Sequence, residues 1–176
     1  MFQSFEVKSD GAKGPERVAQ LRAFMHEAQI DAFIVPHSDP HQNEYLPERD
    51  ERLAWLTGFT GSAGACVVTQ DKAVILVDGR YTLQAREQAD DATFEIDDLV
   101  GLGLSGWISQ NLSEGDKLAF DPWMHTENEI MRLKTLADQR AISLITLQSN
   151  PIDQIWGNQP ALPSGTISIQ PKERAG

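Results

Sequence analysis

The densest group of side chains with metal-binding or acid–base chemistry lies between residues 37 and 44, which read His-Ser-Asp-Pro-His-Gln-Asn-Glu. Two histidines four positions apart would share one face of a helix, and Glu44 could add a carboxylate oxygen as a further ligand. Pro36 and Pro40 disfavour a regular helix across both histidines, because proline lacks a backbone donor and clashes with the preceding turn. We therefore favour a polar loop with hydrogen-bonding roles over a metal site at this position.

A second polar group, Asp78-Gly79-Arg80-Tyr81, directly follows the apolar run 73–77 and opens a predicted helix. Ligands in open sheets gather beyond the carboxyl ends of strands, so this position is a candidate functional edge. Arg80 offers a rigid fork of donors suited to a carboxylate or a peptide carbonyl, and Asp78 could orient that guanidinium or cap the helix. A purely structural Asp–Arg pair at a turn fits the same residues, and both interpretations stay open at this point.

Two glycine-rich stretches resemble phosphate-binding loops. Residues 101–106 match the dinucleotide pattern GxGxxG, but the preceding strand is weak and carries Asp97 and Asp98 at its end. The helix that follows is short and offers a poor dipole for phosphate, so a flexible loop is favoured and nucleotide binding is a third hypothesis. Residues 58–64 hold three glycines, but no Gly-Lys-Ser/Thr follows and a strand comes next. A tight backbone approach or a positive φ explains these glycines better than a P-loop.

Charge and cysteine content restrict the class of protein. The formal net charge is -11 and the isoelectric point is about 4.7, which argues against nucleic acid and against anionic membranes as partners. Cys66 is the one cysteine and lies in an apolar run, which favours a reducing compartment and inert packing over a nucleophile. Residues 1–13 contain charged residues and no long apolar run, which predicts neither a secretory signal nor a membrane anchor. We expect a cytoplasmic protein.

Apolar periodicity predicts strands that alternate with helices. Because Gln70 and Asp71 alone join two apolar runs, those two strands are expected to be antiparallel neighbours, which excludes a purely parallel sheet. The predicted fold is α/β with three layers: a mixed sheet of about six strands, helices on both faces and one internal β-hairpin. Residues 14–156 are predicted to form this domain, after an irregular lead-in at 1–13 and before a Pro/Gly-rich linker at 157–176. Strands are expected at 32–35, in an apolar run that ends near Thr69, and at 72–77, 93–97, 117–120 and 142–146. Helices are expected to begin at Gly14 and at a capping box at Thr126, and to span 53–56, 80–89 and 107–112.

Five short motifs, in this order and spacing, carry a resemblance to a known family. The sequence resembles the amino-terminal domain of Xaa-Pro aminopeptidases (aminopeptidase P), within the creatinase/prolidase group, over about residues 16–160. The motifs are Asp39-x-His41-Gln42-x-Glu44-Tyr45; Arg52-x-x-Trp55-Leu56-Thr57-Gly58-Phe59-Thr60-Gly61-Ser62-Ala63-Gly64; Asp78-Gly79-Arg80-Tyr81 with Gln84-Ala85; Asp121-Pro122; and Asn150-Pro151-Ile152-Asp153-x-Ile155-Trp156.

The resemblance implies a parent metallopeptidase that releases the residue before proline from a peptide. Its catalytic domain would hold two manganese ions, none of whose ligands can be carried over to this chain, so the chain alone is expected to be metal-free and inactive. Arg80 matches an arginine that handles substrate, and His41, Glu44 and Tyr45 are expected to face the same cleft or a subunit interface. The domain would then limit peptide access and contribute to a homodimer. The alternative is a stand-alone binding module with this fold and no peptidase activity.

Overall fold

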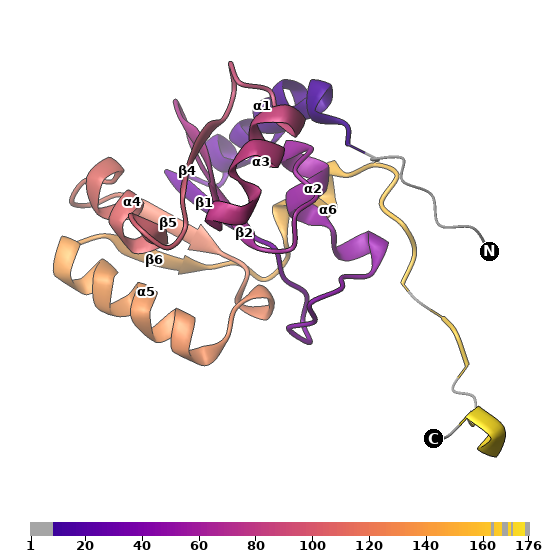
Figure 1. Ribbon diagram of the computed structural model, residues 1–176. Helices are drawn as coiled ribbons and strands as arrows, with labels where there is room; N and C mark the ends of the chain where they lie inside the picture. Colours follow the sequence, from indigo (N-terminus) through magenta and orange to yellow (C-terminus); the bar gives the residue numbers. More distant parts are fainter. Residues whose placement is uncertain (1–8, 163, 167–168, 170, 175–176) are drawn as a thin grey trace.

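A six-stranded sheet in the order β4-β3-β2-β1-β5-β6 forms the centre of the computed structural model, which describes residues 9–162, 164–166, 169 and 171–174 (Figure 1). Strand β2 pairs antiparallel with β1 and β3, whereas β1 with β5, β5 with β6, and β3 with β4 are parallel pairs. The mixed sheet and its hairpin are therefore confirmed, with β2 as the reversed strand. The strands are β1 Ala32–Pro36, β2 Gly64–Thr69, β3 Ala73–Val77, β4 Glu95–Asp98, β5 Lys117–Phe120 and β6 Ser143–Thr146.

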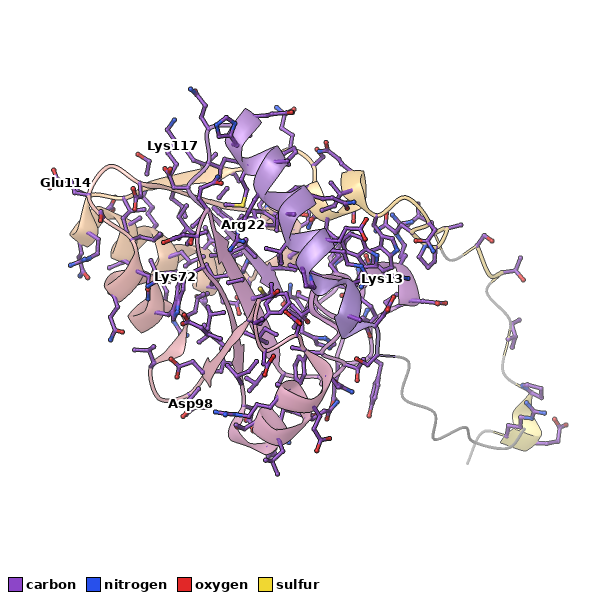
Figure 2. The ribbon with its side chains drawn as sticks, turned by 90° about the horizontal axis from the view of Figure 1, so that it is seen from above. Lys13, Arg22, Lys72, Asp98, Glu114 and Lys117 are labelled. Carbon is purple, nitrogen blue, oxygen red and sulfur yellow. The ribbon has the colours of Figure 1, made fainter. Side chains whose placement is uncertain are left out.

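Helices cover both faces of this sheet, as predicted. On one face lie α1 Gly14–Glu27, α2 Arg52–Thr57, α3 Thr82–Gln88 and α6 Pro151–Ile155, and on the other lie α4 Gly103–Asn111 and α5 Glu127–Arg140 (Figure 1). Strand side chains alternate between the two layers: Phe33 and Val35 pack under the first group, whereas Ala32 and Ile34 pack under the second. Figure 2 shows α1 lying across its face of the sheet, where Arg22 Nε donates to the Thr69 carbonyl at 2.8 Å.

Local sequence signals explain several helix ends. Pro15 lies in the first turn of α1, where its missing N–H has no helical partner to lose. The predicted capping box is present at α5: the Glu129 N–H donates to Thr126 Oγ1 at 3.3 Å, and the Thr126 N–H donates to Glu129 Oε2 at 2.7 Å. Gly58 ends α2 with a φ of 83°, the left-handed conformation that glycine adopts without strain.

Several element boundaries differ from the prediction, and α6 was not predicted. Helix α4 begins at Gly103 rather than at Trp107, because Leu102 and Leu104 also pack against the core on that side. The predicted helix 80–89 divides into a 3-10 turn, Gly79–Tyr81, and α3. Strand β4 starts at Glu95 because the preceding residues form a turn closed on the Asp90 carbonyl, which accepts from the N–H groups of Thr93 and Phe94. Other 3-10 turns span Gly11–Lys13, Glu48–Asp50, Pro122–Met124 and Lys172–Arg174.

The lone cysteine packs inside the sheet, as the sequence predicted. Cys66 is fully buried in β2, and burial raises the pKa of its thiol. A thiol that stays protonated is a poor nucleophile, so Cys66 acts as a small apolar core residue.

His125 is a buried titratable group beside the core layer that α4 and α5 cover. Its Nε2 has no hydrogen-bond partner among the described residues, and its ring packs edge-on against Phe120 with centroids 5.5 Å apart. Burial lowers the pKa of His125, and the negative charges of Glu129 and Asp121 offset part of that shift. The fold therefore favours the neutral imidazole.

Stability is expected to decrease as the pH falls below about 6.5, the ordinary histidine pKa, because the unfolded chain then binds a proton that the folded chain resists. The decrease should continue until the pH passes the lowered pKa of folded His125. Urea unfolding of the wild type and of His125→Gln at several pH values measures it, and the variant should show a flatter profile between pH 7 and pH 5. His26→Gln, an exposed histidine on α1, is the control. A profile for His125→Gln as steep as that of the wild type would assign the effect to other groups.

Candidate functional site

The turn after β3 brings Asp78 and Arg80 to one edge of the sheet. We call this the carboxyl edge: β1, β3, β4, β5 and β6 end there and β2 begins there. Asp78 Oδ1 accepts from the Arg80 backbone N–H at 3.0 Å and from Arg80 Nε at 2.9 Å. These hydrogen bonds lower the pKa of Asp78 and raise the pKa of Arg80. The structural Asp–Arg pair is thus present.

This pair leaves the end of the arginine free. The Arg80 side chain is 73% exposed, and its two terminal nitrogens have no hydrogen-bond partner among the described residues. Because Asp78 holds only Nε, the terminal fork is oriented and remains available to a carboxylate or a peptide carbonyl. The structural and the functional interpretation of the turn are therefore compatible.

The glycine-rich segment 58–63 packs against the turn that carries Arg80. Tyr81 hydrogen-bonds Ser62 through its hydroxyl at 2.8 Å and packs edge-on against Phe59 with ring centroids 5.8 Å apart. A Cβ added at Gly61 would lie 2.3 Å from the Phe59 ring and 2.9 Å from the Tyr81 ring. The close approach predicted for these glycines is confirmed here, and it fixes the residue that follows Arg80.

The loop after β1 is organised by Asp39, whose side chain is fully buried. Asp39 accepts from the backbone N–H groups of His41 at 2.9 Å and Asn43 at 3.0 Å, and from Asn43 Nδ2 at 2.8 Å. Burial alone would raise the pKa of Asp39, but these hydrogen bonds outweigh it and lower the pKa below the usual value. Asp39 therefore anchors the polar loop, which is the interpretation that the sequence favoured.

The other candidate residues of this loop lie exposed at the carboxyl edge. The side chains of His41 and Glu44 are exposed, and Tyr45 is 85% exposed. Glu44 lies close enough to Arg80 for its negative charge to contribute, after Asp78, to the raised pKa of that arginine. Within the described part of the chain, no hydrogen bond joins Arg80 to His41, Glu44 or Tyr45.

The two histidines of the loop do not form a metal cluster. The His37 side chain is mostly buried, with Nδ1 at 3.9 Å from Glu51 Oε2 and Nε2 at 3.5 Å from the Glu44 carbonyl, whereas His41 points to solvent. Among the described residues, no group of three or more His, Cys, Asp or Glu side chains is arranged to hold a metal ion. The prediction that the chain itself binds no metal stays a prediction.

The glycine motif 101–106 does not form a phosphate loop in this structure. The Asp98 carboxylate accepts from the Val100 N–H at 2.8 Å and lies 2.8 Å from the position that a Cβ would take at Gly101. A carboxylate at this place repels a phosphate and already occupies one of the amide donors that would bind it. The geometry gives the nucleotide hypothesis no support.

Two of the sequence motifs, 52–64 and 150–156, form a contact that was not predicted. Arg52 in α2 pairs with Asp153 in α6, through Nε at 2.7 Å and NH2 at 3.0 Å, and with Asp50 at 2.9 Å. Trp55 in α2 and Trp156, the residue that follows α6, stack with ring centroids 5.3 Å apart. Arg52 and Asp153 are 101 positions apart, and so are Trp55 and Trp156. This equal spacing of an opposite-charge pair and a tryptophan pair could have indicated the contact from the sequence.

Comparison with known proteins identifies a family for this chain. The family model described as "Creatinase/Prolidase N-terminal domain" matches residues 17–154. A "Probable Xaa-Pro aminopeptidase P" from Arthroderma otae is 37% identical over 168 residues, which cover 92% of this chain and 26% of the relative. "Xaa-Pro aminopeptidase 2" from Rattus norvegicus is 35% identical over 162 residues, which cover 91% of this chain and 24% of the relative. The chain therefore spans about a quarter of the length of these curated relatives.

Solved structures show the same fold. An X-prolyl aminopeptidase from Caenorhabditis elegans, described as a cytosolic enzyme with a di-nuclear active site, superposes with a TM-score of 0.80 at 26% identity, over 85% of this chain and 26% of that one. The N-terminal domain of the cytoplasmic peptidase PepQ from Mycobacterium tuberculosis gives a TM-score of 0.61 at 27% identity, over 80% of this chain and 98% of that one. No helix among the described residues is long and apolar enough to cross a membrane. The chain belongs to the creatinase/prolidase N-terminal domain family.

Proposed function

We propose that this chain is the N-terminal part of a cytoplasmic metallopeptidase that releases the first residue of peptides with proline in second position. The names of the relatives support this activity, and so does the share of their length that the chain spans. The chain then shapes access of the peptide to a catalytic part outside these 176 residues. It does not itself perform the hydrolysis.

The observation that carries the proposal is the oriented, unoccupied fork of Arg80 at the carboxyl edge. Asp78 fixes the direction of the guanidinium through its hydrogen bond with Arg80 Nε. A peptide carboxylate or carbonyl that reaches this edge can accept two parallel hydrogen bonds from the free nitrogens. Arg80 would therefore position the peptide, and His41, Glu44 and Tyr45 would border the same entrance.

The hydrolytic chemistry belongs to the catalytic part. Two manganese ions bound there would supply a metal-activated water and a polarised scissile carbonyl. The residues of the present chain have other tasks: Arg80 binds and orients the peptide, and Asp78 holds Arg80. The segment from residue 157 onward is proposed as the connector. Its start is anchored, since Gln159 Nε2 donates to the Arg49 carbonyl at 3.0 Å and to Asp153 Oδ1 at 2.6 Å.

Exposed apolar side chains at the carboxyl edge support a packing role for this surface. Tyr45, Leu83 and Trp123 are 85%, 77% and 70% exposed, and they follow β1, β3 and β5 respectively. Tyrosine and tryptophan are enriched at protein interfaces. We propose that the catalytic part packs here. The homodimer is a further prediction from the resemblance, and sedimentation of the full-length protein tests it.

Replacing Arg80 with alanine in the full-length protein is expected to lower kcat/KM for a Xaa-Pro peptide about ten- to a hundredfold, because a charged hydrogen bond to the substrate is lost. Arg80→Lys should recover only part of the activity, since an ammonium lacks the planar fork. Neither change should alter the thermal unfolding midpoint of the protein, because the side chain is exposed. Steady-state kinetics of the two variants measure the effect.

The matched control is Arg86→Ala, an exposed arginine on α3. Its kcat/KM should equal that of the wild type. An unchanged kcat/KM for Arg80→Ala would remove Arg80 from substrate handling. The 176-residue chain, assayed alone for metal content and prolyl peptide cleavage, should be metal-free and inactive. Cleavage by this chain would contradict the division of labour proposed above. Peptide binding with no activity in any longer form would favour the stand-alone module.

A further inference from the structure

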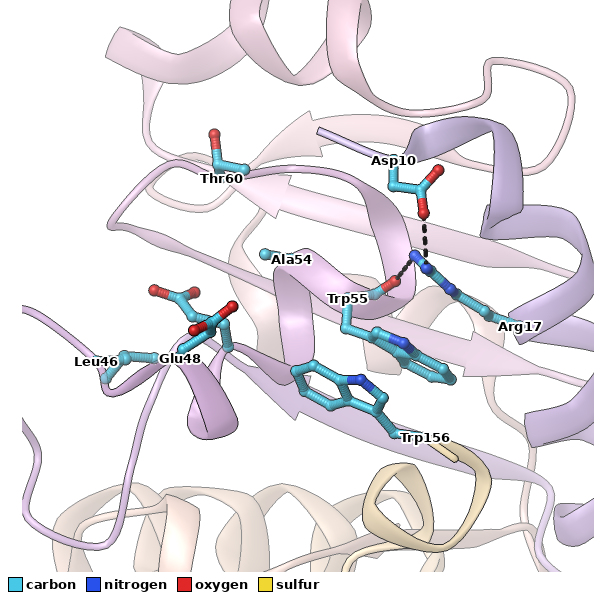
Figure 3. Close-up of a pocket in the computed structure, with 9 residues that line it drawn as sticks. Asp10, Arg17, Leu46, Glu48, Ala54, Trp55, Thr60 and Trp156 are labelled. Carbon is cyan, nitrogen blue, oxygen red and sulfur yellow. Dashed lines mark hydrogen bonds and ion pairs between the residues drawn. The ribbon is translucent and has the colours of Figure 1, made fainter. Parts of the chain in front are cut away.

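A cavity of about 420 Å³ lies beside α1, α2 and α6 (Figure 3). Arg80, His41, Glu44 and Tyr45 do not line it. Its volume is within the range of small-molecule sites, roughly 300–1,000 Å³. The lining residues combine aromatic rings with carboxylates: Asp10, Arg17, Leu46, Glu48, Glu51, Ala54, Trp55, Thr60 and Trp156.

The aromatic wall of the cavity already holds one guanidinium group. Trp55 and Trp156 stack at an interplanar angle of 19°, and the Arg17 guanidinium lies 4.7 Å from the Trp55 ring centroid. Arg17 is held there by the Trp55 carbonyl and by Asp10 at 3.0 Å, as Figure 3 shows. Indole rings attract cations through their negative faces, so this wall suits a positive charge.

The carboxylates on the other side of the cavity lack a cationic partner. Within the described part of the chain, neither Glu48 nor Glu51 forms an ion pair with lysine or arginine, and His37 Nδ1 lies 3.9 Å from Glu51 Oε2. Burial raises the pKa of Glu51, and attraction to His37 offsets only part of that shift. The single cation of the lining, Arg17, is already paired with Asp10. The cavity therefore carries uncompensated negative charge beside an aromatic wall.

We propose that this cavity binds the guanidinium or ammonium group of a basic peptide side chain. Glu48 and Glu51 would accept its hydrogen bonds, and the tryptophan wall would pack against its alkyl stem and its charge. Figure 3 shows the Glu48 carboxylate and the Trp156 indole bordering the same space. This inference is independent of Arg80 and of the peptidase assignment, because it rests on other residues and needs no catalytic part.

The test is a calorimetric titration of the 176-residue chain with N-acetyl-arginine amide, N-acetyl-lysine amide and N-acetyl-leucine amide. We expect saturable binding of the two basic compounds and affinity at least about tenfold weaker for the leucine compound. Glu48→Gln and Glu51→Gln should each weaken binding of the basic compounds about tenfold, because each removes one charged acceptor and keeps the shape. Glu48 is exposed, so its variant is expected to fold normally.

Glu114→Gln is the matched control. Figure 2 places Glu114 on the opposite side of the molecule from Lys13, which pairs with the cavity residue Asp10 at 2.9 Å. Unchanged affinity in this control supports a local site. Three results would overturn the proposal: no saturable binding of either basic compound, equal affinity for the leucine compound, or an equal loss in Glu114→Gln, which would reveal attraction to the net negative charge of the chain.

Discussion

Replacing Arg52 with alanine is expected to lower the free energy of unfolding by about 3 kcal/mol, the lower end of the range for breaking a buried ion pair. Its side chain is 6% exposed, and it bonds Asp153 with two nitrogens and Asp50 with a third. Alanine would leave the carboxylates of Asp50 and Asp153 without their cation, and α6 would lose its ion pair with α2. The lower end is expected because Asp153 is 29% exposed and water can reach it.

Urea unfolding of Arg52→Ala, Asp153→Ala and the double variant measures this effect and its origin. If the pair acts as a unit, Asp153→Ala should cost much less in the Arg52→Ala background than in the wild type. Arg86→Ala on α3 serves as the exposed-arginine control and should change stability little. Stability of Arg52→Ala indistinguishable from that of Arg86→Ala would show that the network contributes nothing.

A second large loss of stability, again about 3 kcal/mol, is expected for Gly58→Ala, because it combines left-handed backbone strain with a steric clash. Gly58 has a φ of 83°. A Cβ there would lie 2.5 Å from Gly11 Cα and 2.7 Å from the Gln88 carbonyl oxygen. Both neighbours are backbone atoms of separate segments and cannot rotate away.

Gly115→Ala separates the two causes. Gly115 has a φ of 89°, but nothing lies within 4 Å of an added Cβ, so the change there measures the backbone strain alone, about 1–2 kcal/mol. Thermal unfolding of both variants gives the difference, which we assign to the clash in Gly58→Ala. Equal losses in the two variants would mean that the segments around Gly11 and Gln88 do not pack as closely as the structure has them.

Short apolar runs that alternate with amphipathic helices were sufficient to predict the layers of this fold. In β1 and β3, buried side chains point to both faces of the sheet, and short apolar runs of this kind are typical of strands covered on both sides. The two-residue link before Lys72 predicted the hairpin, because a chain cannot cross a sheet in two residues. Helix starts were harder: α4 lacks a capping side chain, so its first turn had no signal of its own.

The candidate site was predictable only in part. The position of Arg80 after a buried strand indicated a candidate functional edge, and the structure shows the Asp78–Arg80 pair there. The cavity beside Trp156 was not predictable, because its walls come from segments more than a hundred residues apart. A sequence motif indicates which residues are candidates for a site. Which charged side chains of distant segments lie together is known only from the folded structure.

The reversed direction of β2 has a practical consequence for handling the protein. Because β2 starts at the carboxyl edge, the hairpin turn 70–72 lies at the opposite edge of the sheet. The segment 113–116, which precedes β5, lies at that edge too. The turn that carries Arg80 lies at the other end. Epitope tags, fluorophores and surface-immobilisation linkers therefore belong at this distal end, where they keep the peptide entrance clear.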